Sequence, residues 1–234
     1  KEAYQKALEL SPEDARIAYQ YLLLLAYEGT PQAVEEMQNL AEKVPALAPA
    51  VYVELGKHYW RMKDPQQALT FYNKATDLDP AYEDAYLGRA ELFERTSNFF
   101  FMLREYEQLE KLGYQSADMY TRMGSVYLVG KDLENAQKYY QKAAQIDPGD
   151  VNANYFLAML AEQRQDWPQA LKYLQAAADY NKNSGKWLQA SFYQQKMGHS
   201  QAALDTLKQA YKQFDGSVEI GYFYALALQD AGQH

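Results

Sequence analysis

Histidines and carboxylates are common catalytic acids, bases and metal ligands, and this sequence contains both. The three histidines, His58, His199 and His234, lie far apart in the chain, and none has a carboxylate at metal-ligand spacing. His58 directly precedes Tyr59, a residue of an apolar helical face, which favours a half-buried structural histidine. His199 follows Gly198 in a predicted turn and is expected to be solvated. We therefore expect no catalytic residue, no bound metal and no other cofactor.

Other patterns that carry catalysis are also absent from the printed sequence. It contains no glycine-rich phosphate loop, no nucleophile elbow and no paired metal-ligand motif. Cysteine is absent as well, so disulfides and thiolate metal sites are impossible in these residues. The carboxylates are spread along predicted helix faces and turns, as on solvated surfaces. We therefore predict that these residues form no enzyme.

The formal net charge of −8 is unevenly distributed. Residues 1–116 carry 12 Lys and Arg against 19 Asp and Glu, a balance of −7, whereas residues 117–234 carry 11 against 12, a balance of −1. Phosphate binding needs a basic face, so nucleic acid is not an expected partner. No apolar run approaches the roughly 18 residues of a membrane span, so we expect none in this segment.

The elements of the chain are predicted by a repeated apolar pattern. In residues 49–82, two runs of helical period are separated by a polar break at residues 63–65. Their apolar or small positions are Tyr52, Leu55, Gly56, Tyr59, Ala68, Tyr72 and Ala75, followed by Pro80. The pattern returns in residues 117–150 as Tyr120, Met123, Gly124, Tyr127, Ala136, Tyr140, Ala143 and Pro148. The offset from Gly56 to Gly124 is 68, which is twice 34.

A 34-residue period with this layout of aromatic, small and proline positions resembles the tetratricopeptide repeat (TPR) family. The resemblance covers nearly the whole chain and implies an all-α fold, a right-handed α-solenoid of antiparallel helix pairs. The predicted array spans residues 1–234. Its predicted helix pairs are residues 15–48, 49–82, 83–116, 117–150, 151–183 and 184–217.

Some parts of the array depart from the repeat pattern. Residues 83–116 diverge, because Arg89 takes a usually apolar slot and Met102 a usually small one. Residues 1–14 are predicted to be the second helix of a truncated repeat, and residues 218–234 the first helix of a further one. We therefore expect an excised piece of a longer protein, in which the lack of a targeting signal says nothing about the compartment. Its location stays open between a bacterial cell envelope or periplasm and the cytoplasm.

The resemblance also implies a concave groove lined by the first helix of each pair. The residues carried over as partner-binding are Lys57, Trp60, Glu91, Arg95, Arg122, Ser125, Tyr155, Met159, Leu188, Phe192 and Tyr222. These inward positions are charged or polar in the middle of the chain and aromatic or aliphatic from residue 155 onward, Leu226 included. Exposed apolar surface of this kind marks interfaces. The alternative is that Tyr155, Phe192 and Tyr222 pack on one another.

One TPR subgroup, which binds chaperones, grips a C-terminal carboxylate with Lys and Asn on successive first helices. The matching positions here hold Tyr19, Leu23, Glu54, Asp84 and Gly88, so that activity is not implied.

Three consecutive phenylalanines form the second candidate site. Phe99 fits the usual aromatic at the start of a second helix, whereas Phe100 and Phe101 fall on positions that are polar in the more regular repeats. Either a rotated helix buries Phe100 and Phe101, or they form a contact patch for another chain. We expect burial within a distorted repeat.

The sequence therefore favours a noncatalytic scaffold that binds a peptide or helix of a partner protein in the concave groove. One alternative is self-assembly through apolar end faces, which would make a homo-oligomer. These faces lie around Ala3, Tyr4 and Ala7 and around Tyr224, Ala225 and Leu228. Another alternative is the substrate-recruiting arm of a larger multidomain protein.

Overall fold

The computed structural model describes residues 2, 14–28, 30–215 and 217–230. Its contacts divide the chain into two compact units, Lys1–Gln115 (unit 1) and Ser116–His234 (unit 2). The helix predicted within residues 1–14 falls almost entirely outside the described residues, as does the end face around Ala3, Tyr4 and Ala7.

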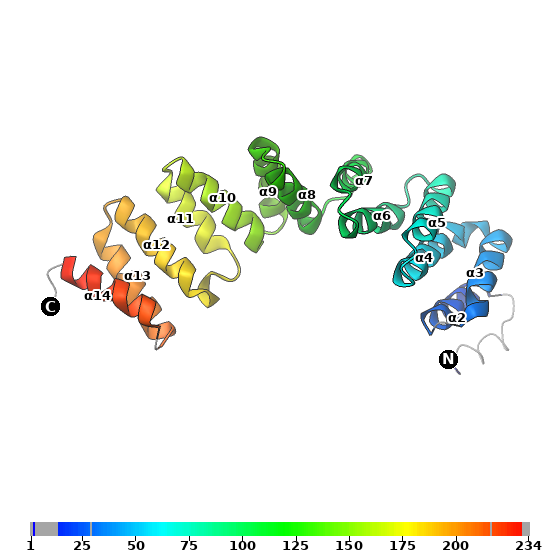
Figure 1. Cartoon of the computed structure of the whole chain (residues 1–234), viewed down its shortest axis with the longest axis horizontal. Helices are drawn as coiled ribbons and strands as arrows, with labels where there is room; N and C mark the ends of the chain where they lie inside the picture. Colours follow the sequence, from blue (N-terminus) through cyan, green and yellow to red (C-terminus); the bar gives the residue numbers. More distant parts are fainter. Residues whose placement is uncertain (1, 3–13, 29, 216, 231–234) are drawn as a thin grey trace. The chain divides into compact units, whose positions relative to one another are not determined.

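Unit 1 consists of successive short helices (Figure 1). They are α2 (Ala15–Tyr27), α3 (Pro31–Lys43), the 3₁₀ turn η1 (Pro45–Leu47), α4 (Ala48–Arg61), α5 (Pro65–Leu78), α6 (Glu83–Arg95) and α7 (Phe99–Lys111). Each helix packs on the next one in the chain, and α4 also packs on α2 and on α6. The first helices of successive pairs, α2, α4 and α6, therefore lie next to one another, as in a stack of helix pairs.

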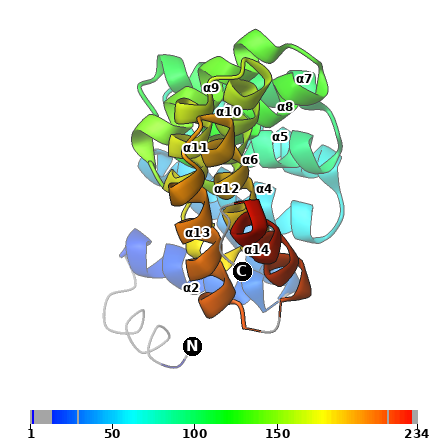
Figure 2. The same cartoon turned by 90° about the vertical axis from the view of Figure 1, so that its left-hand side faces the viewer.

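Unit 2 repeats this arrangement. Its helices are α8 (Ala117–Val129), α9 (Leu133–Ile146), α10 (Val151–Gln163), α11 (Trp167–Ala176), the 3₁₀ turn η2 (Tyr180–Lys182), α12 (Ser184–Lys196), α13 (Ser200–Gln213) and α14 (Val218–Asp230). Contacts join α8 to α10 and α12 to α14, and Figure 2 shows α14 lying beside α13. No strand occurs among the described residues. The prediction of an all-α solenoid of helix pairs is confirmed.

The turns inside the helix pairs explain why the chain reverses at regular intervals. Lys63, Ser97, Lys131 and Gln165 all have φ between 59° and 61°, and each stands one repeat period after the one before. A left-handed residue of this kind ends a helix and satisfies its last carbonyl groups. The next helix then starts from a polar cap. Asp64, for example, accepts a hydrogen bond of 3.0 Å from the backbone N–H of Gln67.

Close contact within and between the helix pairs depends on glycine facing tyrosine. The ring of Tyr72 in α5 lies against Gly56 of α4 and Gly88 of α6, where an added Cβ would come within 2.6 and 2.5 Å of ring atoms. In unit 2, an added Cβ at Gly124 would lie 3.0 Å from the ring of Tyr140. The glycines of the sequence pattern therefore stand where a tyrosine ring lies directly on the helix backbone and leaves little room for a side chain.

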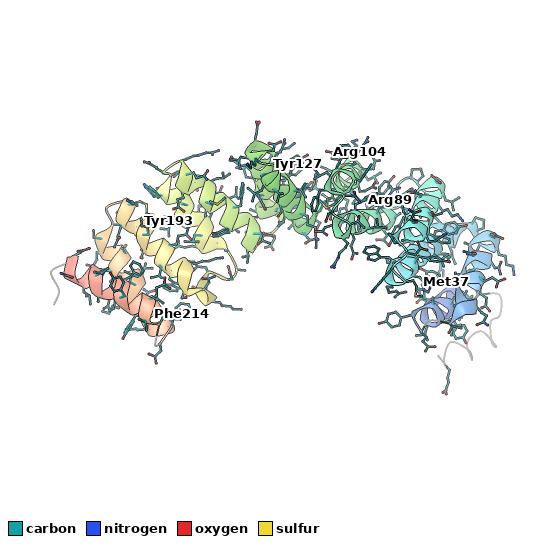
Figure 3. All side chains as sticks on the ribbon, in the orientation of Figure 1. Met37, Arg89, Arg104, Tyr127, Tyr193 and Phe214 are labelled. Carbon is teal, nitrogen blue, oxygen red and sulfur yellow. The ribbon has the colours of Figure 1, made fainter. Side chains whose placement is uncertain are left out.

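In the divergent helix pair α6–α7, Arg89 is accommodated by an ion pair with Glu105. The Arg89 guanidinium (labelled in Figure 3) lies 2.7 Å from a Glu105 carboxylate oxygen and donates a second bond of 2.7 Å to the Asn73 side chain. It also stacks over the Tyr86 ring at 4.8 Å. Burial raises the pKa of Glu105, and Arg89 opposes that shift. A hydrogen-bonded ion pair thus replaces an apolar contact at the centre of this pair.

Candidate functional site

Large apolar side chains at the inward positions of unit 2 are exposed to solvent. Tyr155 on α10, Phe192 on α12 and Tyr222 on α14 have exposed fractions of 51%, 40% and 60%. Met159 and Leu188, at neighbouring inward positions, are half-buried. The ring of Phe192 contacts Trp167 and Tyr193, and the ring of Tyr222 contacts Phe223. These ring contacts do not match the alternative in which Tyr155, Phe192 and Tyr222 pack on one another.

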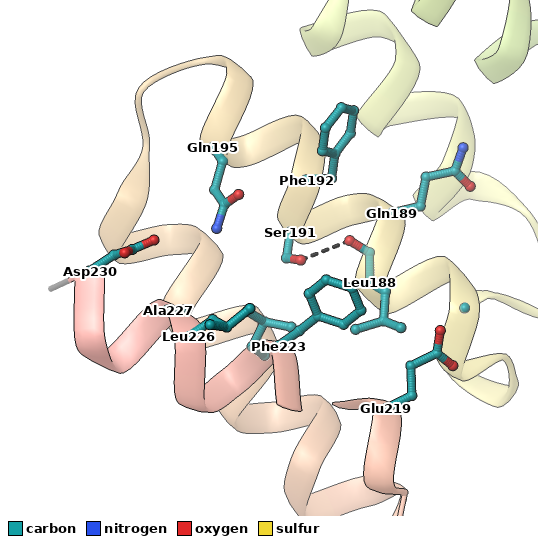
Figure 4. A pocket seen from close by; sticks show the side chains of 12 residues that line it. Leu188, Gln189, Ser191, Phe192, Gln195, Glu219, Phe223, Leu226, Ala227 and Asp230 are labelled. Atoms are coloured by element: carbon teal, nitrogen blue, oxygen red, sulfur yellow. Dashed lines mark hydrogen bonds between the residues drawn. The ribbon is translucent and has the colours of Figure 1, made fainter. Parts of the chain in front are cut away.

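A pocket of about 490 Å³ opens between α12 and α14 (Figure 4). We call it the α12–α14 pocket; its apolar lining is Leu188, Phe192, Leu207, Phe223, Leu226 and Ala227. Its polar lining is Gln189, Ser191, Gln195, Glu219 and Asp230, and Gly185 completes it. The volume is within the range of about 300–1,000 Å³ that is usual for ligand pockets in proteins.

Neighbouring aromatic residues support the apolar wall that α12 contributes to the pocket. The ring of Trp167 meets Phe192 edge-on at 6.0 Å between centroids. Next to it, the fully buried Tyr193 donates a hydrogen bond of 2.7 Å to the Glu162 carboxylate. Gln189 also donates to that carboxylate, at 3.2 Å. Burial, reinforced by Glu162, raises the pKa of Tyr193, so its hydroxyl stays protonated and keeps donating.

The remaining lining residues were only partly anticipated from the sequence. Leu188, Phe192 and Leu226 were expected at inward positions, whereas Phe223, Glu219 and Asp230 were not. Phe223 directly follows the inward Tyr222, and the equivalent position on α12 is the polar Gln189. A second aromatic residue beside an inward one was the signal in the sequence that could have identified Phe223.

The inward positions of unit 1 differ in character. Lys57 donates a bond of 2.7 Å to Glu54 on its own helix, and Arg95 lies 4.0 Å from Glu91 one turn before it. Trp60 is half-buried and packs against the core of α4, α5 and α6. The predicted charged positions of unit 1 therefore meet opposite charges within a single helix.

Arg122 and Ser125 lie on α8, in unit 2. Arg122 donates a bond of 2.7 Å to Asp118 one turn earlier. The Ser125 hydroxyl donates to the carbonyl of Thr121 at 2.9 Å and lies 2.8 Å from the Tyr140 hydroxyl. Thus only Leu188 and Phe192, of the eleven residues predicted to bind a partner in the groove, line the α12–α14 pocket.

The prediction that Phe100 and Phe101 are buried is wrong. Their exposed fractions are 66% and 50%. The buried face of α7 is formed by Met102, Tyr106 and Leu109, and a helix that buries these residues turns Phe100 and Phe101 outward. Phe101 contacts Phe93 and Phe100 at 5.3 and 5.4 Å between ring centroids, and Arg104 lies over Phe100. The three rings form a small apolar patch on the surface of unit 1.

The two described histidines differ in exposure, as the sequence predicted. His58 on α4 is half-buried, and burial together with the nearby Arg61 lowers its pKa. His199 is exposed at the start of α13, and His234 lies outside the described residues. Within the described part of the chain, no group of three potential ligands could hold a metal ion. Nor does that part contain a helix that is both long and apolar enough to cross a bilayer.

The end face predicted on the last helix is partly covered. Tyr224 stacks on Tyr211 of α13 with 5.7 Å between centroids, and Leu228 packs beside the buried Leu204 and Leu207. Ala225 is exposed.

Comparison with known proteins agrees with this architecture. Tetratricopeptide repeat models match residues 49–82, 103–151 and 130–191, which together span more than half of the chain. Anaphase-promoting complex subunit 3 of Schizosaccharomyces pombe is 20% identical over 79% of this chain and 28% of its own length. A TPR repeat-containing protein of Dictyostelium discoideum is 26% identical over 61% of this chain and 57% of its own. The chain thus spans less than two thirds of these relatives.

Solved structures show the same fold. YrrB, described as a TPR protein with an unusual peptide-binding site, superposes with a TM-score of 0.58 at 18% identity, covering 85% of this chain and 99% of YrrB. PilF of Pseudomonas aeruginosa superposes with a TM-score of 0.57 at 16% identity, covering 91% of this chain and 99% of PilF. TPR arrays mediate protein–protein interaction, typically as noncatalytic scaffolds. The chain belongs to the tetratricopeptide repeat family.

Proposed function

We propose that this chain is a noncatalytic scaffold that binds a peptide segment or helix of a partner protein along the inward face of α10, α12 and α14. The observation that carries the proposal is the α12–α14 pocket, into which Phe192 and Leu188 of one first helix and Phe223 and Leu226 of the next contribute apolar surface. Solvated apolar surface in a concave site is favourable to bury, at about 25 cal/mol per Å².

The contacts behind this wall favour binding without large rearrangement. Phe192 is backed by Trp167 and Tyr193, and Tyr193 is held by its hydrogen bond to Glu162. Binding to a surface that is already formed avoids the entropic cost of ordering side chains. Tyrosine and phenylalanine are well suited to such a surface, since they bury much area with few rotatable bonds.

The fold gives the proposal a precedent. YrrB is described as a TPR protein with a peptide-binding site, so a solenoid of this kind can carry one. Because that likeness concerns the fold alone, the residues proposed for this chain rest on its own exposed side chains. The acidic side chains of the pocket, Glu219 and Asp230, are better suited to recognising charge than to catalysis, since no nucleophile and base are paired among its described lining residues.

The test is a capture experiment with matched variants of the full chain. The binding variant is Tyr155→Ala/Phe192→Ala, and the control is Lys57→Ala/Glu91→Ala, which removes two charges from the inward positions of unit 1. All proteins are compared well below their unfolding temperatures, which are measured first. We expect wild type and control to retain a partner from lysate that the binding variant loses. With the purified partner, the binding variant should show an affinity at least about tenfold weaker.

Two results would count against the proposal. Equal capture of the partner by the binding variant and the wild type would remove the inward face of unit 2 from consideration. Loss of capture in the Lys57→Ala/Glu91→Ala control alone would move the site to unit 1.

A further inference from the structure

The α12–α14 pocket has a charge pattern that restricts what can bind in it. Its two charged lining residues are Glu219, in the first turn of α14, and Asp230, at the end of the same helix. Among the described residues that line the pocket, none is Lys, Arg or His. The apolar Phe223 and Leu226 lie between the two carboxylates (Figure 4).

The carboxylates are not neutralised within the described part of the chain. No ion pair there involves Glu219 or Asp230. The lysines of the neighbouring helix α12 have other contacts: Lys186 is buried in an ion pair with Asp179, and Lys196 lies over the Phe192 ring at 5.2 Å. An occupant of the pocket would therefore meet two negative charges.

The polar side chains that α12 contributes to the pocket, Gln189, Ser191 and Gln195, are uncharged and do not change this balance. The Ser191 hydroxyl donates to the Leu188 carbonyl at 2.7 Å, and Gln189 donates to Glu162. The donor groups of Ser191 and Gln189 therefore have partners within the protein. The charge complementarity of the site is set by Glu219 and Asp230.

From this arrangement we infer that the pocket binds an extended partner segment in which bulky apolar residues are flanked on both sides by Lys or Arg. The inference rests on the proposed function and names the chemistry of its partner. The apolar residues fill the space between Phe192 and Phe223, and each flanking cation lies near one carboxylate. Complementary charges of this kind set specificity and association rate, while the apolar contacts supply most of the affinity.

The length of α14 sets the spacing of the two cations. Between Glu219 in its first turn and Asp230 at its end, the helix rises by about 16 Å along its axis. An extended segment advances about 3.3 Å per residue, so about five residues cover this distance. Side chains alternate along a strand, so only an even separation, about four or about six, places both cations on the same side of the segment as the apolar residues. We choose about six, because it leaves two positions on that side for apolar residues between the cations.

The test uses four labelled peptides and fluorescence anisotropy with the full chain. The probe SKSFSLSKS carries Phe and Leu between two lysines. Its partners are SESFSLSES, with reversed charge, SQSFSLSQS, without charge, and SKSSSSSKS, without apolar residues. We expect the lysine probe to bind at least about tenfold more tightly than the glutamate peptide at low salt, and the difference to shrink at high salt. The peptide without apolar residues should not bind.

Protein variants separate the charge preference from the pocket itself. Glu219→Gln/Asp230→Asn keeps the shape of the lining and should reduce the preference for lysine over glutamate to about threefold or less. Phe192→Ala should weaken the lysine probe and the neutral peptide alike, with thermal unfolding as the check on folding. If the wild type binds the lysine and glutamate peptides equally well and Phe192→Ala binds neither, the inference is overturned and the proposed function stands. If no peptide binds the wild type, the inference is overturned, and the capture experiment decides the proposed function separately.

Discussion

Units 1 and 2 are built from the same helix pairs but present different side chains at the equivalent inward positions. In unit 1, Lys57 and Glu91 are each paired with an opposite charge on their own helix. In unit 2, Phe192 and Tyr222 occupy such positions and are exposed. A surface that neutralises its own charges gains little by binding, whereas an exposed apolar surface gains by being covered.

The difference shows which parts of the repeat the fold constrains. The packing positions are filled in the same way in both units, for example by Leu55 and Met123, which are both fully buried. Inward positions make few contacts within the solenoid, so their side chains can change without loss of the fold. Among the packing positions, Arg89 is the exception. It lies one repeat period from Leu55 and one from Met123, so a charged residue stands where the neighbouring repeats have an apolar one.

The largest effect on stability is expected when Arg89 of unit 1 is replaced by Met, the residue at the equivalent position 123 of unit 2. Arg89→Met leaves the half-buried Glu105 carboxylate without its partner and should lower the free energy of unfolding of unit 1 by about 3 kcal/mol. Hydrogen exchange in α6 and α7 measures this loss, with α9 and α10 of unit 2 as an internal reference.

A second variant separates the ion pair from simple packing. Glu105 lies one repeat period before Tyr139, so Arg89→Met/Glu105→Tyr installs the pair of residues found in unit 2. Replacing a buried ion pair by apolar residues of suitable shape is often neutral or stabilising, so the double variant should recover most of the loss. Burial raises the pKa of Glu105, so the loss in the single variant should shrink as the pH falls and this carboxyl becomes protonated. A loss that did not depend on pH would contradict this explanation.

An intermediate effect is expected where glycine meets tyrosine. Gly56→Ala and Gly88→Ala each place a Cβ within 2.6 Å of the Tyr72 ring and should cost about 1–3 kcal/mol. Gly124→Ala meets Tyr140 at 3.0 Å, a contact that a small shift relieves. Alanine also favours a helix over glycine by about 1 kcal/mol, so Gly124→Ala should be close to neutral. Urea unfolding of the three variants tests this order, and an equal cost at all three positions would contradict it.

The sequence predicted the features that depend on the repeat period. The small residues at Gly56 and Gly124, the polar break before Pro65 and the unusual slot of Arg89 were all visible, because each one is a local departure from or match to the repeating pattern. The structure agrees with the expected stack of helix pairs for that reason.

The surface was harder to predict, because exposure depends on neighbouring helices. The rotation of α7 is set by Met102, Tyr106 and Leu109, and a misjudged rotation led to the wrong expectation for Phe100 and Phe101. The α12–α14 pocket depends on side chains from two helices that are not consecutive in the chain. Glu219 and Asp230 therefore had no signal in the sequence that set them apart from other exposed carboxylates.

The smallest expected effect is a change in how stability depends on pH, caused by a histidine of unit 1. Burial and the nearby Arg61 lower the pKa of His58 in unit 1, while a ring hydrogen bond to the backbone of Ala26 opposes the shift. The folded state disfavours the charged imidazole of His58. The stability that the neutral imidazole contributes is therefore fully present above the pKa of histidine in the unfolded chain, about 6.5. It is lost as the pH falls from that value toward the lower pKa of the folded state, since the unfolded state then binds the proton more readily. Wild type should therefore lose more stability between neutral and mildly acidic pH than His58→Gln, measured by urea unfolding at each pH. His199→Gln in unit 2, which removes an exposed histidine, is the matched control.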